Sequence, residues 1–274
     1  MKQFFYRYES IISFSSPVSA HSWLLRCMPR REPFQRVERA LLRASVVGQD
    51  GGELEIPVCF GRDAFGNAVQ TGYVSEAHHR FRIVSEGTVR QTPYRICDTA
   101  HGMYLEYTAL TGPDGSMKRF AGQASGGKAD APEGLLPGGG ALDEALSLCA
   151  AVHGYMTYVP GVTTVNTTAA QAFALGRGVC QDYAHVLIAL LRHCGIPARY
   201  VCGYLVGEGA THAWVEFFDQ GVWRGLDPTN NRLLQYGCIK VAHGRDSADC
   251  SVNRGVFSGR TVQQNTLDIK VEEQ

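Results

Sequence analysis

Three residues in the second half of the chain have the types that nucleophilic catalysis by a thiolate requires. Cys180 stands in the segment GRGVCQD (176–182), His212 in THAWVEF (211–217) and Asp227 in GLDPTN (225–230). A thiol nucleophile needs a base that takes its proton and a third group that holds this base in place. We therefore interpret Cys180 as a nucleophile, His212 as its base and Asp227 as the residue that orients the base.

Each of these residues also has an ordinary structural interpretation. A free cysteine is commonly a small buried side chain, so Cys180 alone is weak evidence for catalysis. His212 could be a plain strand histidine, and Asp227 precedes Pro228 as turn-forming residues often do. The catalytic hypothesis rests on the three residues together.

The residues after Cys180 predict a helix that begins at this cysteine. Apolar side chains recur at three- and four-residue steps, which is typical of one buried helical face: Tyr183, Val186, Leu187, Leu190, Leu191 and Cys194. Gly195 followed by Ile196-Pro197 predicts the end of the helix. Cys180 would then lie in the first turn, where unpaired N–H groups and the helix dipole favour a thiolate.

Three strands are expected to carry the other two residues, over 199–206, 212–218 and 222–227. If Asp219-Gln220 forms a two-residue hairpin loop, His212 lies directly opposite Asp227. Opposed residues have Cβ atoms roughly 4.5–5.5 Å apart, which lets an imidazole meet a carboxylate. A three-residue loop without a bulge would place the two side chains on opposite faces of the sheet.

The first part of the chain, from Lys2 to about Thr111, predicts short strands separated by turns. Several short strands at this spacing favour a sandwich, and the candidates are 6–14, 22–27, 36–44, 54–60, 68–75, 81–89 and 103–111. The pair His78-His79 is interpreted as a solvated turn between strands rather than as ligands or catalytic groups. Nothing in this region has the interleaved aromatic and basic residues of a nucleic-acid platform.

The middle of the chain predicts a linker and then the first helices of a second unit. A short helix is expected over 118–124, and seven of the nineteen residues from Gly122 to Gly140 are glycine, which is typical of a flexible connector. Helical spacing returns over 142–156. Thr168 is a plausible N-cap for a short helix that ends near Gly176. Strands are expected again over 236–243 and 266–271.

Composition restricts the class of protein. The chain has 274 residues, 45% of them apolar, which is enough for a full core and two domains. Lys plus Arg equals Asp plus Glu at 26 each, so charge favours neither nucleic acid nor an anionic membrane surface. The first nine residues contain charges and predict a strand rather than a signal peptide, and no apolar run approaches the ~20 residues of a membrane span.

The nine cysteines indicate a reducing compartment. Their number is odd and their spacing is not clustered, which argues against a disulfide framework and favours a cytoplasmic protein. The isolated pairs Cys149…His153 and His193-Cys194 do not provide the four ligands of a structural zinc site. We therefore expect neither a metal nor a cofactor.

Four motifs resemble those of bacterial transglutaminase-like proteins, which are often described as candidate cysteine proteases: GRGVCQDYAH (176–185), GIPARYVCGY (195–204), HAWVEF (212–217) and GLDPTN (225–230). The amino-terminal part is similar to the β-rich domain that precedes the core in that family, and Gly244-Arg245-Asp246 resembles an element of the family's tail. The resemblance implies an α+β protein: a β-sandwich-like domain over 1–121, a linker over 122–140, and a papain-like core over 141–274 with helices packed on an antiparallel sheet.

The resemblance also implies acyl transfer through a thioester on Cys180, with a peptide or protein amide as substrate. Hydrolysis is preferred because water needs no dedicated acceptor site; transfer to an amine, as in a protein-glutamine transglutaminase, an acetyltransferase-like reaction and a non-catalytic binding module remain alternatives. Tyr158, Gln181 and Trp214 are candidates for the walls of the cleft or for the oxyanion site, each with an equally good structural interpretation.

Overall fold

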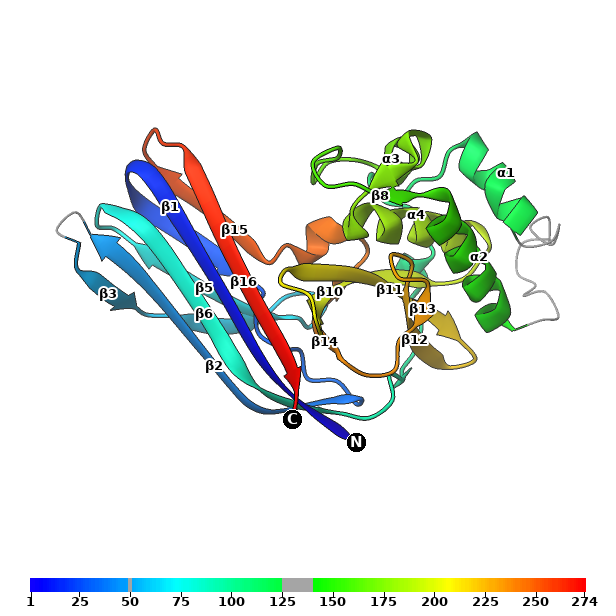
Figure 1. Ribbon diagram of the computed structural model, residues 1–274, viewed down its shortest axis with the longest axis horizontal. Coiled ribbons are helices and arrows are strands. Elements are labelled where there is room, and N and C mark those ends of the chain that lie inside the picture. The colour runs from blue at the N-terminus through cyan, green and yellow to red at the C-terminus, as the bar shows by residue number, and fades with distance from the viewer. Residues whose placement is uncertain (49–50, 125–139) are drawn as a thin grey trace.

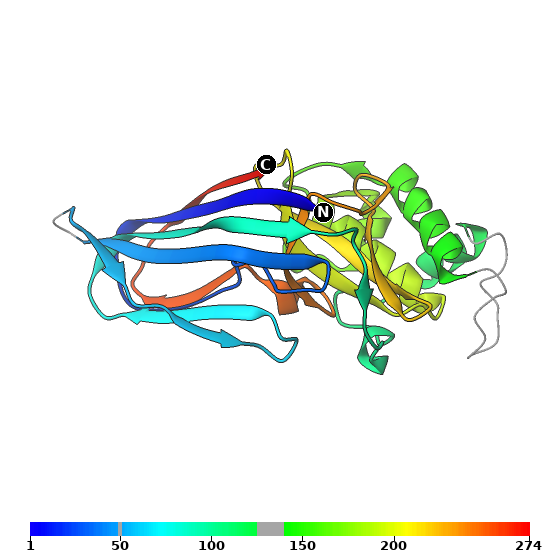
Figure 2. The same ribbon diagram turned by 90° about the horizontal axis from the view of Figure 1, so that it is seen from below.

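The computed structural model describes residues 1–48, 51–124 and 140–274. Figure 1 shows two parts side by side: long antiparallel strands on the left, and helices packed against a second sheet on the right. Figure 2, seen from below, shows the long strands running toward the helical part. The α+β class expected from the sequence is confirmed.

The first part is organised around β1 (Lys2–Leu25), in which buried and more exposed residues alternate over most of its length. Its first half pairs with one strand on each side, and its second half, after a register shift between Ser13 and Val18, pairs with two others. β1 is therefore one long strand whose two halves pair with different strands of a curled sheet. The strands paired with β1 are β5 (Ala68–Val74), β6 (His78–Gln91), β15 (Asn253–Ser258) and β16 (Gln263–Glu273). Beyond them lie β2 (Gln35–Gly48) and β3 (Glu53–Ile56) on the side of β6, and β4 (Cys59–Arg62) on the side of β5.

The last two strands of the chain lie in this first part. β16 pairs with β1 from Phe4 to Phe14, and β15 pairs with its second half. The amide N–H of Gln274 donates to the carbonyl of Gln3 at 2.9 Å, so the two ends of the described chain lie together. The boundaries expected from the sequence assign 141–274 to the core, whereas the structure places β15 and β16 against β1. Of the expected linker, 125–139 lies outside the described residues and 122–124 end a helix.

Three expectations for the first part were wrong. The segment 54–60 is two short strands, β3 and β4, with Pro57 between them. The segment 103–111 is not a strand but a 3-10 turn, η1 (Gly102–Tyr104), and loops, because it packs on a core helix whose Arg192 donates to the Tyr104 carbonyl. His78 begins β6 and is fully buried, with one ring nitrogen 3.1 Å from a ring nitrogen of His21, so it is not a solvated turn.

The second part packs helices on an antiparallel sheet, as expected for the core. The helices are α1 (Gly115–Ala124), α2 (Ala141–Tyr155), α3 (Ala169–Leu175) and α4 (Cys180–His193). The sheet has the order β13 (Arg232–Leu233), β12 (Val222–Asp227), β11 (Thr211–Asp219), β10 (Ala198–Leu205) and β14 (Cys238–Gly244), with β7 (Ile96–Cys97) beside β12. α4 lies on β10 and β11, and most of its residues are buried. Within the described ranges, no helix has the length and apolar character needed to cross a membrane.

Two short segments bring other residues to the start of α4. β8 (Thr157–Tyr158) pairs in parallel with β9 (Arg177–Gly178), which leads directly into the helix. The Thr168 hydroxyl caps α3 by accepting from the N–H of Gln171, and Gly176 ends that helix with a positive φ of 60°. The expected N-cap and the expected end of this helix are therefore confirmed.

Candidate functional site

Cys180 is the first residue of α4 and is half-buried, as the helical spacing predicted. The carboxylate of Asp182 holds the turn before it by accepting from the backbone N–H of Val179 at 2.8 Å and from the Thr163 hydroxyl at 2.7 Å. A Cβ atom on Gly178 would lie 2.5 Å from this carboxylate, so only glycine permits the close approach. The sulfur is thereby presented at a helix amino terminus that favours negative charge.

The hairpin that carries His212 and Asp227 differs from the expected register by two residues. Asp219 pairs with Val222, so the two-residue loop is Gln220-Gly221 and not Asp219-Gln220. Both loop residues have positive φ, 49° and 82°, as a type I′ turn requires. The predicted direct opposition of His212 and Asp227 is therefore wrong. Because the error is an even number of residues, the two side chains still point to the same face.

The imidazole and the carboxylate meet in spite of this shift. His212 Nε2 lies 3.0 Å from Asp227 Oδ2, and both residues are buried, at 3% and 0% exposure. The other oxygen, Asp227 Oδ1, accepts from the N–H of Thr229 at 3.0 Å, and the Asn230 amide donates to Oδ2 at 2.8 Å. Burial alone would raise the pKa of Asp227, but the hydrogen bond and the charge of His212 lower it below its usual range. Asp227 is thus held as an anion.

The imidazole of His212 also interacts with Cys180. Burial lowers the pKa of His212, yet hydrogen bonds to Asp227 and to Cys180 outweigh it and raise the pKa to about 10. Nε2 faces Asp227, so Nδ1 is the ring nitrogen that remains for the thiol. The imidazole thus interacts with Asp227 and with Cys180. Such an arrangement can support proton transfer from a thiol to the ring.

The three additional candidates lie at different distances from this chemistry. Tyr158 is 51% exposed and pairs with Gly178, two residues before Cys180. Burial and the charges of Cys180 and Glu208 raise the pKa of its hydroxyl. Gln181 lines a cavity beside Cys180. Trp214 stacks near His212 with ring centroids 6.4 Å apart, but it is fully buried and its indole N–H donates to the Tyr94 hydroxyl at 3.0 Å. This N–H is therefore already used inside the protein.

A cavity of about 480 Å³ lies beside Gln181, the residue after Cys180. Six of its lining residues are Gln181, Tyr200, Cys202, Thr211, Ser247 and Arg254. Asp246 of the Gly-Arg-Asp element caps the 3-10 turn η3 (Ser247–Cys250) by accepting from the N–H of Ala248 at 2.8 Å. This element thus shapes one wall of the cavity. Its volume is within the range of small-molecule and side-chain binding sites.

Two residues near the site were not singled out in the sequence. Glu208 lies in the turn between β10 and β11, and its carboxylate is 3.7 Å from His212 Nδ1. Asp182 is the third residue of α4 and holds the turn before Cys180. An acidic residue three positions after an N-cap is a recognised sequence signal and could have identified Asp182. No local signal distinguishes Glu208 from an ordinary turn residue.

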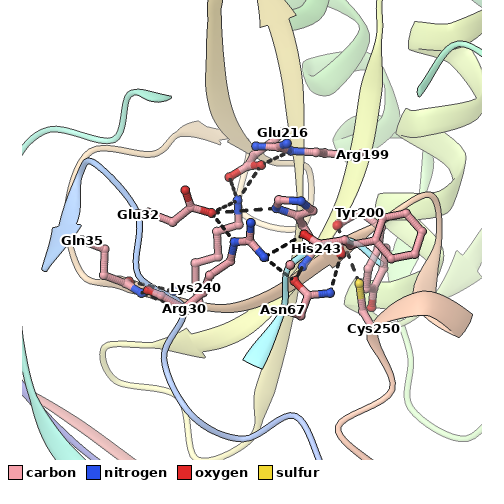
Figure 3. A network of polar contacts seen from close by, with 12 residues as sticks. Arg30, Glu32, Gln35, Asn67, Arg199, Tyr200, Glu216, Lys240, His243 and Cys250 are labelled. Atoms are coloured by element: carbon pink, nitrogen blue, oxygen red, sulfur yellow. Dashed lines mark hydrogen bonds and ion pairs between the residues drawn. The ribbon is translucent and has the colours of Figure 1, made fainter. Parts of the chain in front are cut away.

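A buried polar network fixes the strand that carries His212 (Figure 3). Glu216 lies four residues after His212 on β11. It contacts Arg199, the Tyr94 hydroxyl and Lys240, and Lys240 Nζ lies 2.8 Å from Glu216 Oε1. Lys240 Nζ also lies 3.0 Å from Glu32 in the segment before β2. The charges of Arg199 and Lys240 overcome burial and lower the pKa of Glu216 to about 2.

Residues of the first part complete this network. The Gln35 side chain donates to the Lys240 carbonyl at 2.8 Å and accepts from the Lys240 N–H at 2.9 Å. The Asn67 side chain does the same with the backbone of His243, at 2.8 and 2.9 Å. Buried side-chain amides thus substitute for a neighbouring strand along β14. The first part of the chain is therefore directly involved in positioning the sheet of the candidate site.

Comparison with known proteins identifies both parts. The model of the transglutaminase-like superfamily matches residues 136–228, and that of the bacterial transglutaminase-like N-terminal region matches 5–90. An uncharacterized protein of Mycobacterium leprae is 41% identical over 127 residues, which are 43% of this chain and 44% of that protein. A protein-glutamine gamma-glutamyltransferase of Pseudomonas aeruginosa is 41% identical over 66 residues, 19% of this chain and 10% of that protein.

The crystal structure of a candidate cysteine protease from Cytophaga hutchinsonii has the same fold, with a TM-score of 0.77 and 21% identity. The match covers 99% of this chain and 90% of that one. The chain spans less than half the length of the M. leprae relative. Since the two family models together match both parts of the molecule, and the core match contains Cys180, His212 and Asp227, this chain belongs to the transglutaminase-like superfamily.

Proposed function

We propose that this protein is a cysteine-dependent acyltransferase that acts on amide bonds through a thioester on Cys180, with water as the usual acceptor. The observation that carries the proposal is the buried contact of His212 Nε2 with Asp227 Oδ2 at 3.0 Å, together with the pKa of His212, which hydrogen bonds to Asp227 and to Cys180 raise to about 10. A peptide or protein amide is the proposed substrate. The cavity beside Gln181 is large enough for one side chain of the acyl portion.

The first half of the proposed reaction forms the thioester. The thiolate of Cys180 attacks the amide carbonyl, and the resulting oxyanion is stabilised by the backbone N–H of Cys180 in the first turn of α4. A donor of this kind contributes roughly 3 kcal/mol in the transition state. The C–N bond then breaks while His212 gives its Nδ1 proton to the departing nitrogen. Asp227 keeps the ring in the orientation that this transfer requires.

The second half returns the enzyme to its starting state. Water approaches the thioester, His212 takes one of its protons, and the new C–O bond forms as the C–S bond breaks. The products are a carboxylic acid and the Cys180 thiolate beside the imidazolium. Water is the proposed acceptor because it needs no binding site of its own.

Transfer to an amine is the second candidate function. The similarity to a protein-glutamine gamma-glutamyltransferase over 66 residues favours it. In that reaction a primary amine replaces water, and the product is a substituted amide. Ammonia release from casein is measured with and without a labelled alkylamine, and incorporation of the label is measured in parallel. Both functions release ammonia, but only transfer incorporates the amine into the protein.

The Cys180→Ala variant tests the proposal itself. Turnover and labelling of this position by iodoacetamide at neutral pH are both expected to vanish. Cys59→Ala is the matched control, because Cys59 is an exposed thiol on β4 in the other part of the molecule, and its removal should leave turnover unchanged. Turnover that survives in Cys180→Ala would remove the hypothesis. Alkylation of Cys180 no faster than that of Cys59 would instead favour a non-catalytic binding module.

A further inference from the structure

A carboxylate outside the proposed triad faces the imidazole of His212. Glu208 Oε2 lies 3.7 Å from His212 Nδ1, and the Glu208 side chain is 39% exposed. The turn that carries it is held at two points: the Glu208 N–H donates to the Leu205 carbonyl at 3.2 Å, and the N–H of Ile269 on β16 donates to the Gly209 carbonyl at 3.2 Å. Glu208 therefore stands on an anchored turn with its carboxylate open to solvent.

Tyr158 lies near the same point. β8 places it beside Gly178, two residues before the nucleophile, and half of its surface is exposed. Burial and the charges of Cys180 and Glu208 together raise the pKa of its hydroxyl. An exposed aromatic ring therefore lies beside the turn that leads into Cys180. Aromatic faces and carboxylates both attract cations.

The reaction geometry requires a nitrogen atom at this position. Nε2 of His212 is occupied by Asp227, so Nδ1 is the atom that gives a proton to a departing amine or takes one from an attacking amine. Any such amine lies within hydrogen-bonding distance of Nδ1. Because the Glu208 carboxylate is 3.7 Å from the same atom, it lies next to the reacting nitrogen.

We propose that Glu208, together with Tyr158, forms a binding site for a primary alkylammonium group, which is the amine portion of the substrate. This inference rests on the proposed acyl-transfer function and specifies its amine side: primary alkylamines, such as a lysine side chain or a diamine, are favoured as leaving groups and as acceptors. An amine that carries a nearby negative charge is disfavoured at this site.

A primary alkylamine that acts as the acceptor loses two protons at the site. An alkylamine with a pKa near ~10.4 is protonated at neutral pH, so it arrives as an ammonium ion and releases one proton to solvent at the site. As its nitrogen attacks the thioester, the C–N bond forms, the C–S bond breaks, and His212 takes a second proton. The Cys180 thiolate and the imidazolium are restored. Departure of an amine is the reverse of these events.

The charge of the cavity beside Gln181 is opposite to that of the Glu208 site. Its lining carries the guanidinium of Arg254, which is exposed on β15 and donates to the Ala248 carbonyl at 2.8 Å. An ammonium group is repelled there and attracted to Glu208. The cavity and the Glu208 site therefore differ in charge, which favours one orientation of the amide.

A test that needs no enzymatic turnover compares two thiol reagents of opposite charge. The cationic 2-aminoethyl methanethiosulfonate and the anionic 2-sulfonatoethyl methanethiosulfonate react with Cys180, and the rates are read from the Cys180 peptide by mass spectrometry. The cation-to-anion rate ratio is expected to fall in Glu208→Gln by on the order of three- to tenfold, because a charge close to the sulfur is removed. The ratio cancels any change in the fraction of thiolate.

Glu55→Gln is the matched control. It removes the same charge from an exposed position on β3, at the far end of the first part, and the ratio is expected to stay at the wild-type value (Figure 1). An unchanged ratio in Glu208→Gln would overturn the proposed site. This outcome is independent of whether the protein turns over an amide.

A second measurement uses acceptors of different charge in the catalytic assay. Cadaverine is a dication at neutral pH, whereas hydroxylamine is mostly neutral. In Glu208→Gln the KM for cadaverine is expected to rise several-fold relative to that for hydroxylamine. An equal effect on both acceptors would reject the ammonium site while acyl transfer stands. Loss of all thioester formation in the wild type would reject the proposed function. The ratio of the two reagent rates would then still test whether Glu208 attracts cations to Cys180.

Discussion

His212 Nε2 lies 3.0 Å from Asp227 Oδ2, although these two residues are not partners across the hairpin. The last pair in the ladder between the two strands is Val215 with Leu226, so the contact runs diagonally past the end of the ladder. It is held from the other side, because the Thr229 N–H and the Asn230 amide orient the carboxylate. The turn after β12 and the pairing of Asp227 with Arg232 on β13, and not the pairing of β12 with β11, set the position of Asp227.

Asp227→Asn is expected to lower kcat/KM by roughly 10²- to 10⁴-fold. The amide removes the charge that stabilises the imidazolium and permits the wrong ring tautomer. Amide hydrolysis measured at neutral pH checks this. Arg232→Gln is the control, because Arg232 is 45% exposed and its Nε lies 3.5 Å from the same carboxylate; its effect should stay within about threefold. Equal activities of Asp227→Asn and Arg232→Gln would contradict the assigned role.

The stabilising contribution of His212 is expected to decline at alkaline pH. Its pKa is raised from 6.5 to about 10 in the folded state, so its stabilising contribution is complete below pH 6.5 and is lost as the pH rises through about 10. Urea unfolding of the wild type and of His212→Gln at pH 6, 8 and 10 measures this stabilising contribution. The difference in unfolding free energy should shrink along this series. A difference that grows with pH would show that the imidazole is not held as a cation.

Lys240→Met is expected to lower the free energy of unfolding by about 3–5 kcal/mol. It removes a cation from a fully buried cluster and leaves Glu216 and Glu32 with fewer partners. Lys270→Met is the matched control, because Lys270 is 58% exposed and its ion pair with Glu272 is on the surface; its cost should be within about 0.5 kcal/mol. Similar losses in both variants, measured by urea unfolding, would mean that the network contributes little.

Gly203→Ala is expected to destabilise the sheet next to His212 by about 1–3 kcal/mol. A Cβ atom there would overlap the Ile239 carbonyl and lie 2.5 Å from the ring of Trp214. Activity should fall with it, since Trp214 stacks near His212. Gly154→Ala in α2 has no atom within 4 Å of the added Cβ and should gain about 0.5 kcal/mol. A change of melting temperature in the same direction for both variants would contradict this packing.

What could be predicted from the sequence was local. The start of α4 at Cys180 follows from the apolar spacing and the preceding glycines, and the cap at Thr168 follows from residues three positions apart. The strands over 198–205, 211–219 and 222–227 follow from short runs of aromatic and β-branched residues. Even the shared face of His212 and Asp227 survived the wrong loop, because side chains alternate with a period of two.

Tertiary structure alone decided the rest, because the interactions concerned join residues that are far apart in the chain. The register of β11 and β12 depended on which two residues adopt positive φ, and the sequence was compatible with a two-residue or a three-residue loop. The burial of His78 against His21, the pairing of β16 with β1 and the approach of Glu208 to His212 have no local signal. Lys240 illustrates the reason: a lysine is normally solvated, and only carboxylates brought from Glu32 and Glu216 make its burial stable.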